Sequence, residues 1–237
     1  MEQPSKPNDE ISKSGSLSKG AMSEETAKPV LQGVIVIDKP LGPTSMSMVN
    51  LIRRKCRKAK TGHAGTLDPL ATGVLVLGIG RMTKKLGQMM DTDKRYTTVI
   101  DLSATTAGLD AEAPREEVEI AHIPTLEEMK AAVQSFSGEI MQAPPIFSAV
   151  KVNGHRAYAI ARKGKEVKLA PRKVTVHAIE LVSYTWPFVA IDIKCAKGFY
   201  VRALARDLGK KLSVGGYCTE IRRTEVGRFT LEIAKQL

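Results

Sequence analysis

Apolar residues recur along the chain with the period of two that is typical of strands. Residues 33–38 and 74–79 are nearly continuous apolar runs bounded by glycine or proline, a pattern that predicts buried strands. Alternation of apolar and polar residues predicts three further strands, at residues 96–102, 174–182 and 189–195. Strands therefore make up much of the expected fold.

Three segments have helical spacing instead. The first begins at Thr44 or Ser45, either of which can cap a helix with one apolar face and one basic face. The second begins with a capping box formed by Thr125 and Glu128. Its expected apolar stripe is Leu126, Met129, Val133 and Phe136, and Gly138 can end it. The third spans residues 200–212, and four of its basic side chains are expected to be available to solvent or a ligand: Arg202, Arg206, Lys210 and Lys211.

Strands and helices mixed without strict alternation favour an α+β fold with a mixed, largely antiparallel sheet flanked by helices. A tight reversal is expected at Asn153-Gly154, followed by a short helix at residues 157–163. Residues 1–32 are rich in Ser, Lys, Glu and Pro and lack periodicity, which predicts a disordered tail. Residues 33–237 are expected to form one domain.

Charge narrows the range of partners. The chain has 36 Lys and Arg against 25 Asp and Glu, a formal net charge of +11, so a nucleic acid is the expected partner and an anionic membrane surface the second choice. No apolar run is long enough to span a membrane and no secretory signal is evident, so we expect a cytoplasmic protein. The three cysteines are far apart and lack metal-ligand spacing, which argues against a disulfide framework and a zinc site.

The loop at residues 61–73 is the first candidate for chemistry. Asp68 precedes Pro69, which biases the backbone toward extended geometry and fixes a carboxylate among small residues. Asp68 is therefore a candidate catalytic acid, although it could instead cap a helix or turn after Pro69. His63 could equally be an ordinary polar loop residue, and the loop lacks the spacing of a phosphate-binding P-loop.

The stretch from residue 62 to residue 75, GHAGTLDPLATGVL, resembles the signature of the TruB family of pseudouridine synthases, which modify the T-loop uridine of tRNA. Five further motifs occur in the family's order: Asp38-Lys39-Pro40 with Gly42, Asp93-Lys94-Arg95-Tyr96, the run 142–151, the run 197–202 and the run 221–227. The resemblance extends from about residue 33 to residue 237.

The resemblance implies both an activity and its catalytic residues. Uridine is isomerised by breaking the bond from C1′ to N1, turning the base and joining C1′ to C5, which requires no cofactor or metal. The family's catalytic carboxylate corresponds to Asp68, a suitable nucleophile or base. Arg202 matches the basic residue that pairs with it and keeps it ionised. Tyr96 matches the tyrosine that stacks on the target base and is a candidate for handling the C5 proton.

The same resemblance implies how RNA is bound. His63 matches the residue that holds the flipped nucleotide, and Lys39 lies in a Lys-Pro pair near the active cleft. Tyr200 belongs to the motif that contains Arg202, and we expect it to contact substrate. Residues 142–169, including Lys151 and Arg156, resemble an insertion that closes over the RNA arm, although a solvated basic hairpin is the alternative. We expect one partner, the tRNA T-arm, bound by a monomer without an obligate protein partner.

Three departures and two rival functions qualify this interpretation. Residues 102–110 follow the family pattern loosely, Ile221 stands where leucine is usual, and no accessory RNA-binding domain is expected after the catalytic domain. The first rival is the catalytic subunit of a guide-RNA pseudouridylation particle, and the second is a non-catalytic tRNA-binding chaperone. A membrane-surface protein would need an amphipathic helix with a bulky apolar face, which the sequence lacks.

Overall fold

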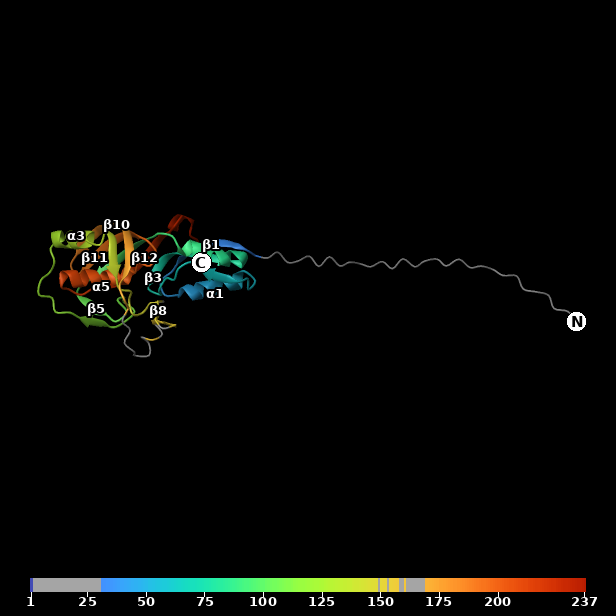
Figure 1. The fold of residues 1–237 in the computed structure, drawn as a ribbon, viewed down its shortest axis with the longest axis horizontal. Coiled ribbons are helices and arrows are strands. Elements are labelled where there is room, and N and C mark those ends of the chain that lie inside the picture. Colours follow the sequence, from blue (N-terminus) through green and yellow to red (C-terminus); the bar gives the residue numbers. More distant parts are fainter. Residues whose placement is uncertain (2–30, 149, 153, 158–159, 161–168) are drawn as a thin grey trace.

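A nine-stranded mixed sheet forms the centre of the computed structural model (Figure 1). The structure describes residues 1 and 31–237, except 149, 153, 158–159 and 161–168. Seven strands follow one another in the spatial order β1 (Gly33–Lys39), β3 (Ala71–Ile79), β12 (Tyr217–Val226), β4 (Lys94–Asp101), β11 (Phe188–Cys195), β10 (Arg172–Thr185) and β7 (Gly138–Gln142). β2 (Thr61–His63) pairs with β3, and β13 (Phe229–Thr230) pairs with β12.

The remaining elements are short strand pairs and helices. Two separate hairpins are β5 (Ala104–Thr106) with β6 (Arg115–Glu117), and β8 (Lys151–Val152) with β9 (His155–Arg156). The α-helices are α1 (Ser45–Lys55), α2 (Leu86–Met90), α3 (Leu126–Gln134) and α5 (Val201–Leu212), and the 3₁₀ helices are η1 (Gly80–Lys85) and η2 (Leu231–Ile233). Among the pairings in the large sheet, β12 with β3 is parallel and the others are antiparallel. This mixed architecture confirms the predicted α+β class.

The continuous apolar run of β3 is explained by burial on both faces. Leu75 and Leu77 point into the main core, which the helices α1, α3 and α5 cover. Val74 and Val76 point the other way, into a smaller cluster with Val36 on β1. A strand covered on both faces needs apolar residues at successive positions, so β3 shows no alternation.

The predicted capping residues begin α1 and α3, but two other features of α3 differ from the prediction. Thr44 caps α1, because its hydroxyl accepts a hydrogen bond from the Ser47 backbone N–H at 3.0 Å. The capping box of α3 is present, with both of its hydrogen bonds formed between Thr125 and Glu128. However, Leu126 is 42% exposed rather than part of the apolar stripe. The helix also ends at Gln134, before the glycine expected to stop it.

β12 joins the two halves of the sheet. One of its edges pairs with β3 and the other with β4, the strand that carries Tyr96. At the β3 edge, Gly73 has a φ of +99°, and a Cβ placed there would lie 2.2 Å from the carbonyl oxygen of Arg223. Only glycine permits this close approach of the two backbones.

Several expectations concern residues beyond those described. The reversal at residues 148–158 is confirmed as far as β8 and β9, which pair Lys151 with Arg156. The helix expected at residues 157–163 and the tail at residues 1–32 lie largely outside the described residues, so the predicted domain organisation stays a prediction. No helix in the described part of the chain is long and apolar enough to cross a membrane.

Candidate active site

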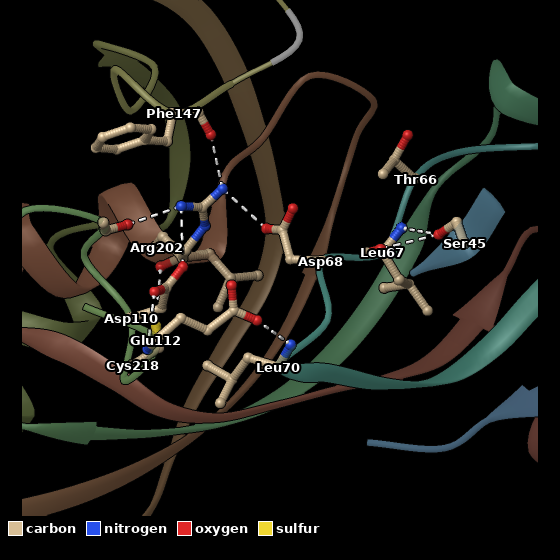
Figure 2. A network of polar contacts seen from close by, with 12 residues as sticks. Ser45, Thr66, Leu67, Asp68, Leu70, Asp110, Glu112, Phe147, Arg202 and Cys218 are labelled. Carbon is tan, nitrogen blue, oxygen red and sulfur yellow. Dashed lines mark hydrogen bonds and ion pairs between the residues drawn. The ribbon is translucent and has the colours of Figure 1, made fainter. Parts of the chain in front are cut away.

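The loop that carries Asp68 is fixed at its backbone by α1. Ser45, in the first turn of that helix, is buried, and its hydroxyl donates to the Leu67 carbonyl at 2.9 Å and accepts from the Leu67 N–H at 2.8 Å (Figure 2). Leu67 itself is buried in the main core. The residue immediately before Asp68 is therefore anchored through both its backbone and its side chain.

The Asp68 carboxylate does not cap the turn that follows it. The Ala71 N–H donates to the backbone carbonyl of Asp68 at 3.1 Å. The Leu70 N–H donates to the carboxylate of Glu112 at 2.7 Å. Both donors that a capping carboxylate would use are thus occupied, which leaves the Asp68 side chain for another role. That side chain is 40% exposed and within reach of a ligand.

Arg202 holds the Asp68 carboxylate from the first turn of α5 (Figure 2). Its Nη2 lies 2.8 Å from Oδ2 of Asp68 and 2.9 Å from the Phe147 carbonyl oxygen. Its Nη1 lies 3.0 Å from Oδ2 of Asp110 and 2.7 Å from the Gly108 carbonyl oxygen. The side chain is 8% exposed, so the expectation that it is available to solvent is wrong, although it does meet Asp68. One guanidinium thereby links four segments of the chain.

Asp110 is the second carboxylate on this guanidinium, and its side chain is 6% exposed. Burial raises the pKa of the Asp110 carboxyl, and the adjacent Arg202 opposes this effect. The sequence pattern did not single out Asp110, since it lies in the loop at residues 102–110 that follows the family pattern loosely. The signal that the sequence offered was the presence of an acidic residue, Asp110, at the end of that loop.

Lys39 holds the Asp68 loop through hydrogen bonds from its side chain to backbone carbonyl oxygens. Its side chain is fully buried, and Nζ donates to the carbonyl oxygens of Pro40 at 2.8 Å and Pro69 at 3.3 Å. Burial lowers the pKa of the Lys39 ammonium, while the carboxylates of Glu112 and Asp68 oppose that shift. The ammonium thus lies close to Asp68 but is shielded from solvent, which suits a positioning role better than direct contact with RNA.

Tyr96 lies on β4 directly opposite Arg223 of β12 and packs against the main core. Burial raises the pKa of the Tyr96 phenol, the Arg223 guanidinium opposes the shift, and the Asp68 carboxylate reinforces it. Arg223 is 1% exposed and donates to three carbonyl oxygens around the Asp68 loop, those of Gly65, Thr66 and Val74. Arg223 therefore lies between Tyr96 and the backbone of the Asp68 loop, which it holds in place. The sequence pattern gave Arg223 no role.

Among the residues expected to bind RNA, the structure describes the surroundings of His63 and Tyr200 and gives only backbone positions for Lys151 and Arg156. Burial and the Arg223 charge lower the pKa of His63, and its buried Nδ1 has no hydrogen-bond partner among the described residues. Tyr200 precedes α5 and is held by two hydrogen bonds between its backbone and the Gln142 side chain. Lys151 and Arg156 are placed only by their backbones in β8 and β9.

The described residues contain no cluster of His, Cys, Asp or Glu that could hold a metal ion. Two of the three cysteines, Cys195 and Cys218, are buried, and burial raises the pKa of each thiol to about 12. Such thiols are protonated near neutral pH and are poor nucleophiles. The reactive group that this site offers is the Asp68 carboxylate.

Comparison with protein families identifies a match over most of this domain. Residues 53–201 match the family described as TruB family pseudouridylate synthase (N terminal domain). The chain is 45% identical over 214 residues to tRNA pseudouridine synthase B of Paenarthrobacter aurescens, covering 88% of this chain and 69% of that protein. It is 47% identical over 210 residues to the protein of that name from Mycobacterium tuberculosis, covering 86% and 70%.

Solved structures give the same fold at lower identity. A Cbf5-Nop10-Gar1 complex matches with a TM-score of 0.67 and 29% identity, over 86% of this chain and 52% of the matched chain. An H/ACA RNP bound to a substrate RNA containing 2′-deoxyuridine matches with a TM-score of 0.64 and 26% identity, over 86% and 50%. The chain thus spans about half the length of these structural relatives.

Proposed function

The chain belongs to the TruB family of pseudouridylate synthases, and on that premise we propose that it converts the T-loop uridine of tRNA to pseudouridine at Asp68. The observation that carries the proposal is the Asp68 carboxylate itself. It is 40% exposed, stands on an anchored loop and lies 2.8 Å from a guanidinium that is almost fully buried. A carboxylate held this way is accessible to a ligand and restricted in orientation.

The proposed chemistry uses only groups of the enzyme and the substrate. The Asp68 carboxylate assists cleavage of the bond between C1′ and N1 and is free again when C1′ has joined C5. The C5 proton leaves and N1 gains a proton, so no oxidant, reductant or donor is consumed. Arg202, which is itself paired with Asp110, holds the Asp68 carboxylate in one orientation through both steps.

Tyr96 supplies the stacking surface for the extruded base. Since burial raises the pKa of its phenol, the ring is neutral at neutral pH. A neutral phenol can accept the C5 proton only if it gives up its own proton at the same time, and we propose the Asp68 carboxylate as the group that receives it. His63 has its pKa lowered and is likewise neutral, which suits a position beside the extruded nucleotide.

Sequence identity favours a tRNA enzyme that acts alone over the catalytic subunit of a guide-RNA particle. The relatives named tRNA pseudouridine synthase B are 45–47% identical to the chain. The matched chain of the Cbf5-Nop10-Gar1 complex is 29% identical. We therefore assign tRNA as the substrate, and we propose that the enzyme acts as a monomer without an obligate protein partner.

The deciding experiment is incubation of the purified protein with unmodified tRNA and mapping of pseudouridine at each uridine. We expect product at the T-loop uridine without any guide RNA or added protein. A T-arm hairpin should also be converted. Product that appears only after a guide RNA is added would refute the proposal in favour of the guide-dependent alternative.

Tyr96→Phe should lower pseudouridine formation by at least about a hundredfold while tRNA affinity changes little, because the ring still stacks but the hydroxyl is lost. Tyr96→Ala should also weaken tRNA binding, by about 1–3 kcal/mol, because the stacking surface is removed. Product formation under single-turnover conditions and equilibrium tRNA binding measure the two effects separately. Tyr184→Phe is the matched control, since that hydroxyl donates to the Pro124 carbonyl, outside the site. Full activity in both Tyr96 variants would mean that Tyr96 only packs.

A further inference from the structure

Glu112 has an exposed carboxylate in the active site that the proposed chemistry does not use. Its Oε1 accepts a hydrogen bond from the Leu70 N–H at 2.7 Å, in the turn that follows Asp68 (Figure 2). No ion pair between described residues involves Glu112. Its one described polar partner outside its own segment is therefore the backbone of the turn that carries the reacting carboxylate.

The segment that carries Glu112 is fixed to the sheet and to the ion pairs of the site. The Ala111 N–H donates to the carbonyl oxygen of Cys218 on β12 at 3.1 Å. The Glu112 N–H donates to Oδ1 of Asp110 at 3.2 Å, while Oδ2 of Asp110 contacts the guanidinium that holds Asp68. The segment thus acts on Asp68 twice, through the partner of its side chain and through the backbone of its turn.

The Leu70 N–H is the donor that the Asp68 side chain would otherwise use. An Asp side chain readily accepts a hydrogen bond from the backbone N–H two residues further on, which forms an Asx-turn. Asp68 and Leu70 have this spacing, and the chain already turns there, since the Ala71 N–H donates to the Asp68 carbonyl at 3.1 Å. With Glu112 on the donor, the Asp68 carboxylate instead lies 2.8 Å from Arg202.

A buried cation offsets the repulsion between the two carboxylates of this turn. Nζ of Lys39 donates to the Pro69 carbonyl oxygen at 3.3 Å, beside both Asp68 and Glu112. Burial lowers the pKa of the Lys39 ammonium, and the charges of Glu112 and Asp68 oppose this shift, so the ammonium is near both of them. Glu112 can therefore stay ionised and accept the backbone N–H without displacing the charge of Asp68.

We propose that Glu112 is a positioning residue, which keeps the Asp68 carboxylate available for the reaction by occupying the Leu70 N–H. Without Glu112, the Asp68 carboxylate would divide between two arrangements, one on Arg202 and one capping its own turn. A self-capped carboxylate is turned toward its own backbone and cannot reach the substrate C1′. The rate then falls with the fraction of molecules in the active arrangement. The inference rests on the proposed function, because it gives Glu112 a part in the same reaction.

The test compares two substitutions of Glu112. Glu112→Ala removes the acceptor and should lower the single-turnover rate at saturating tRNA by about tenfold to a hundredfold, because a hydrogen bond to a charged group then competes with the active arrangement. Glu112→Gln keeps a side-chain oxygen that accepts the Leu70 N–H, so it should recover the rate to within about threefold of the unaltered protein. Affinity for tRNA should fall in neither variant, because each removes a negative charge. Thermal unfolding should change little, because the side chain is exposed.

The crystal structure of Glu112→Ala gives a readout that does not depend on activity. We expect one carboxylate oxygen of Asp68 within about 3.2 Å of the Leu70 nitrogen and no longer on Arg202. The matched control is Glu116→Ala, which removes an exposed carboxylate from the nearby strand β6. The control should keep the unaltered rate, and its Asp68 should stay paired with Arg202.

An unaltered rate in Glu112→Ala would overturn the proposal, and so would a crystal structure of that variant in which Asp68 stays on Arg202. A rate for Glu112→Gln as low as that of Glu112→Ala would mean that charge matters and the acceptor does not, which also overturns it. An equal loss in Glu116→Ala is the last overturning result. If the unaltered protein makes no pseudouridine in tRNA, the proposed function fails instead, and the crystal structure of Glu112→Ala still tests whether Glu112 holds Asp68 in place.

Discussion

Asp68→Asn is expected to abolish pseudouridine formation, lowering the single-turnover rate by at least about a thousandfold while tRNA still binds. Asparagine keeps the size of the side chain and can still accept a hydrogen bond from Arg202, so the loop should stay folded. It cannot supply the anionic oxygen that the reaction uses. The loss corresponds to about 4 kcal/mol of transition-state stabilisation.

The measurement combines a single-turnover assay, equilibrium tRNA binding and thermal unfolding of the same preparation. Asp207→Asn is the matched control, because Asp207 also lies 2.8 Å from an arginine, the adjacent Arg206. The control should retain full activity. Turnover by Asp68→Asn above about a tenth of the unaltered rate, less than about 1.4 kcal/mol of lost stabilisation, would exclude Asp68 as the reacting carboxylate.

Arg202→Lys should lower the rate by about thirtyfold to a thousandfold although the charge is retained, which corresponds to about 2–4 kcal/mol. The guanidinium contacts two carboxylates, Asp68 and Asp110, together with two carbonyl oxygens. An ammonium has three donors and no planar fork, so it leaves at least one buried acceptor without a partner. Asp68 would then lose its fixed orientation.

Arg206→Lys is the matched control, since Arg206 lies one turn further along α5 and also bonds a carboxylate and a carbonyl oxygen. It is more exposed than Arg202, so lysine should be tolerated there. Rates on tRNA and on the T-arm hairpin should fall together in Arg202→Lys, because the defect is in orientation of the carboxylate. Equal rates for the two lysine variants would contradict the proposed role of Arg202.

The strands and helices that bury a regular apolar pattern were predictable from the sequence. β12 was not, although it lies inside the sheet. Its pairing with β4 is irregular between Cys218 and Glu220 and again between Arg223 and Glu225, which interrupts the period of two. It also buries Arg223, whose charge is satisfied by carbonyl oxygens of a loop far away in the sequence. A buried arginine in an irregular strand hides the pattern that identifies strands.

The candidate site was predictable where a motif carried it and not where tertiary contacts complete it. The resemblance supplied Asp68, Tyr96 and Arg202, and the structure brings Arg202 onto Asp68. Helical spacing alone groups Arg202 with the exposed basic residues of α5. Spacing within one helix carries no information on the Asp110 carboxylate, which comes from another segment and pairs with Arg202. Glu112 escaped notice for the same reason, since its partner is the Leu70 N–H on another loop.

The position of β12 has a consequence for when the enzyme becomes active during synthesis. β3 follows the loop of Asp68, β4 carries Tyr96, and in the large sheet both pair with β12, residues 217–226. The ribosome makes the two catalytic segments early, yet the strand between them emerges after nearly all the rest of the domain. Contacts so distant in sequence form slowly, because a long loop of chain must close first. A nascent chain that stops before Tyr217 would therefore hold every catalytic residue and still lack an assembled site.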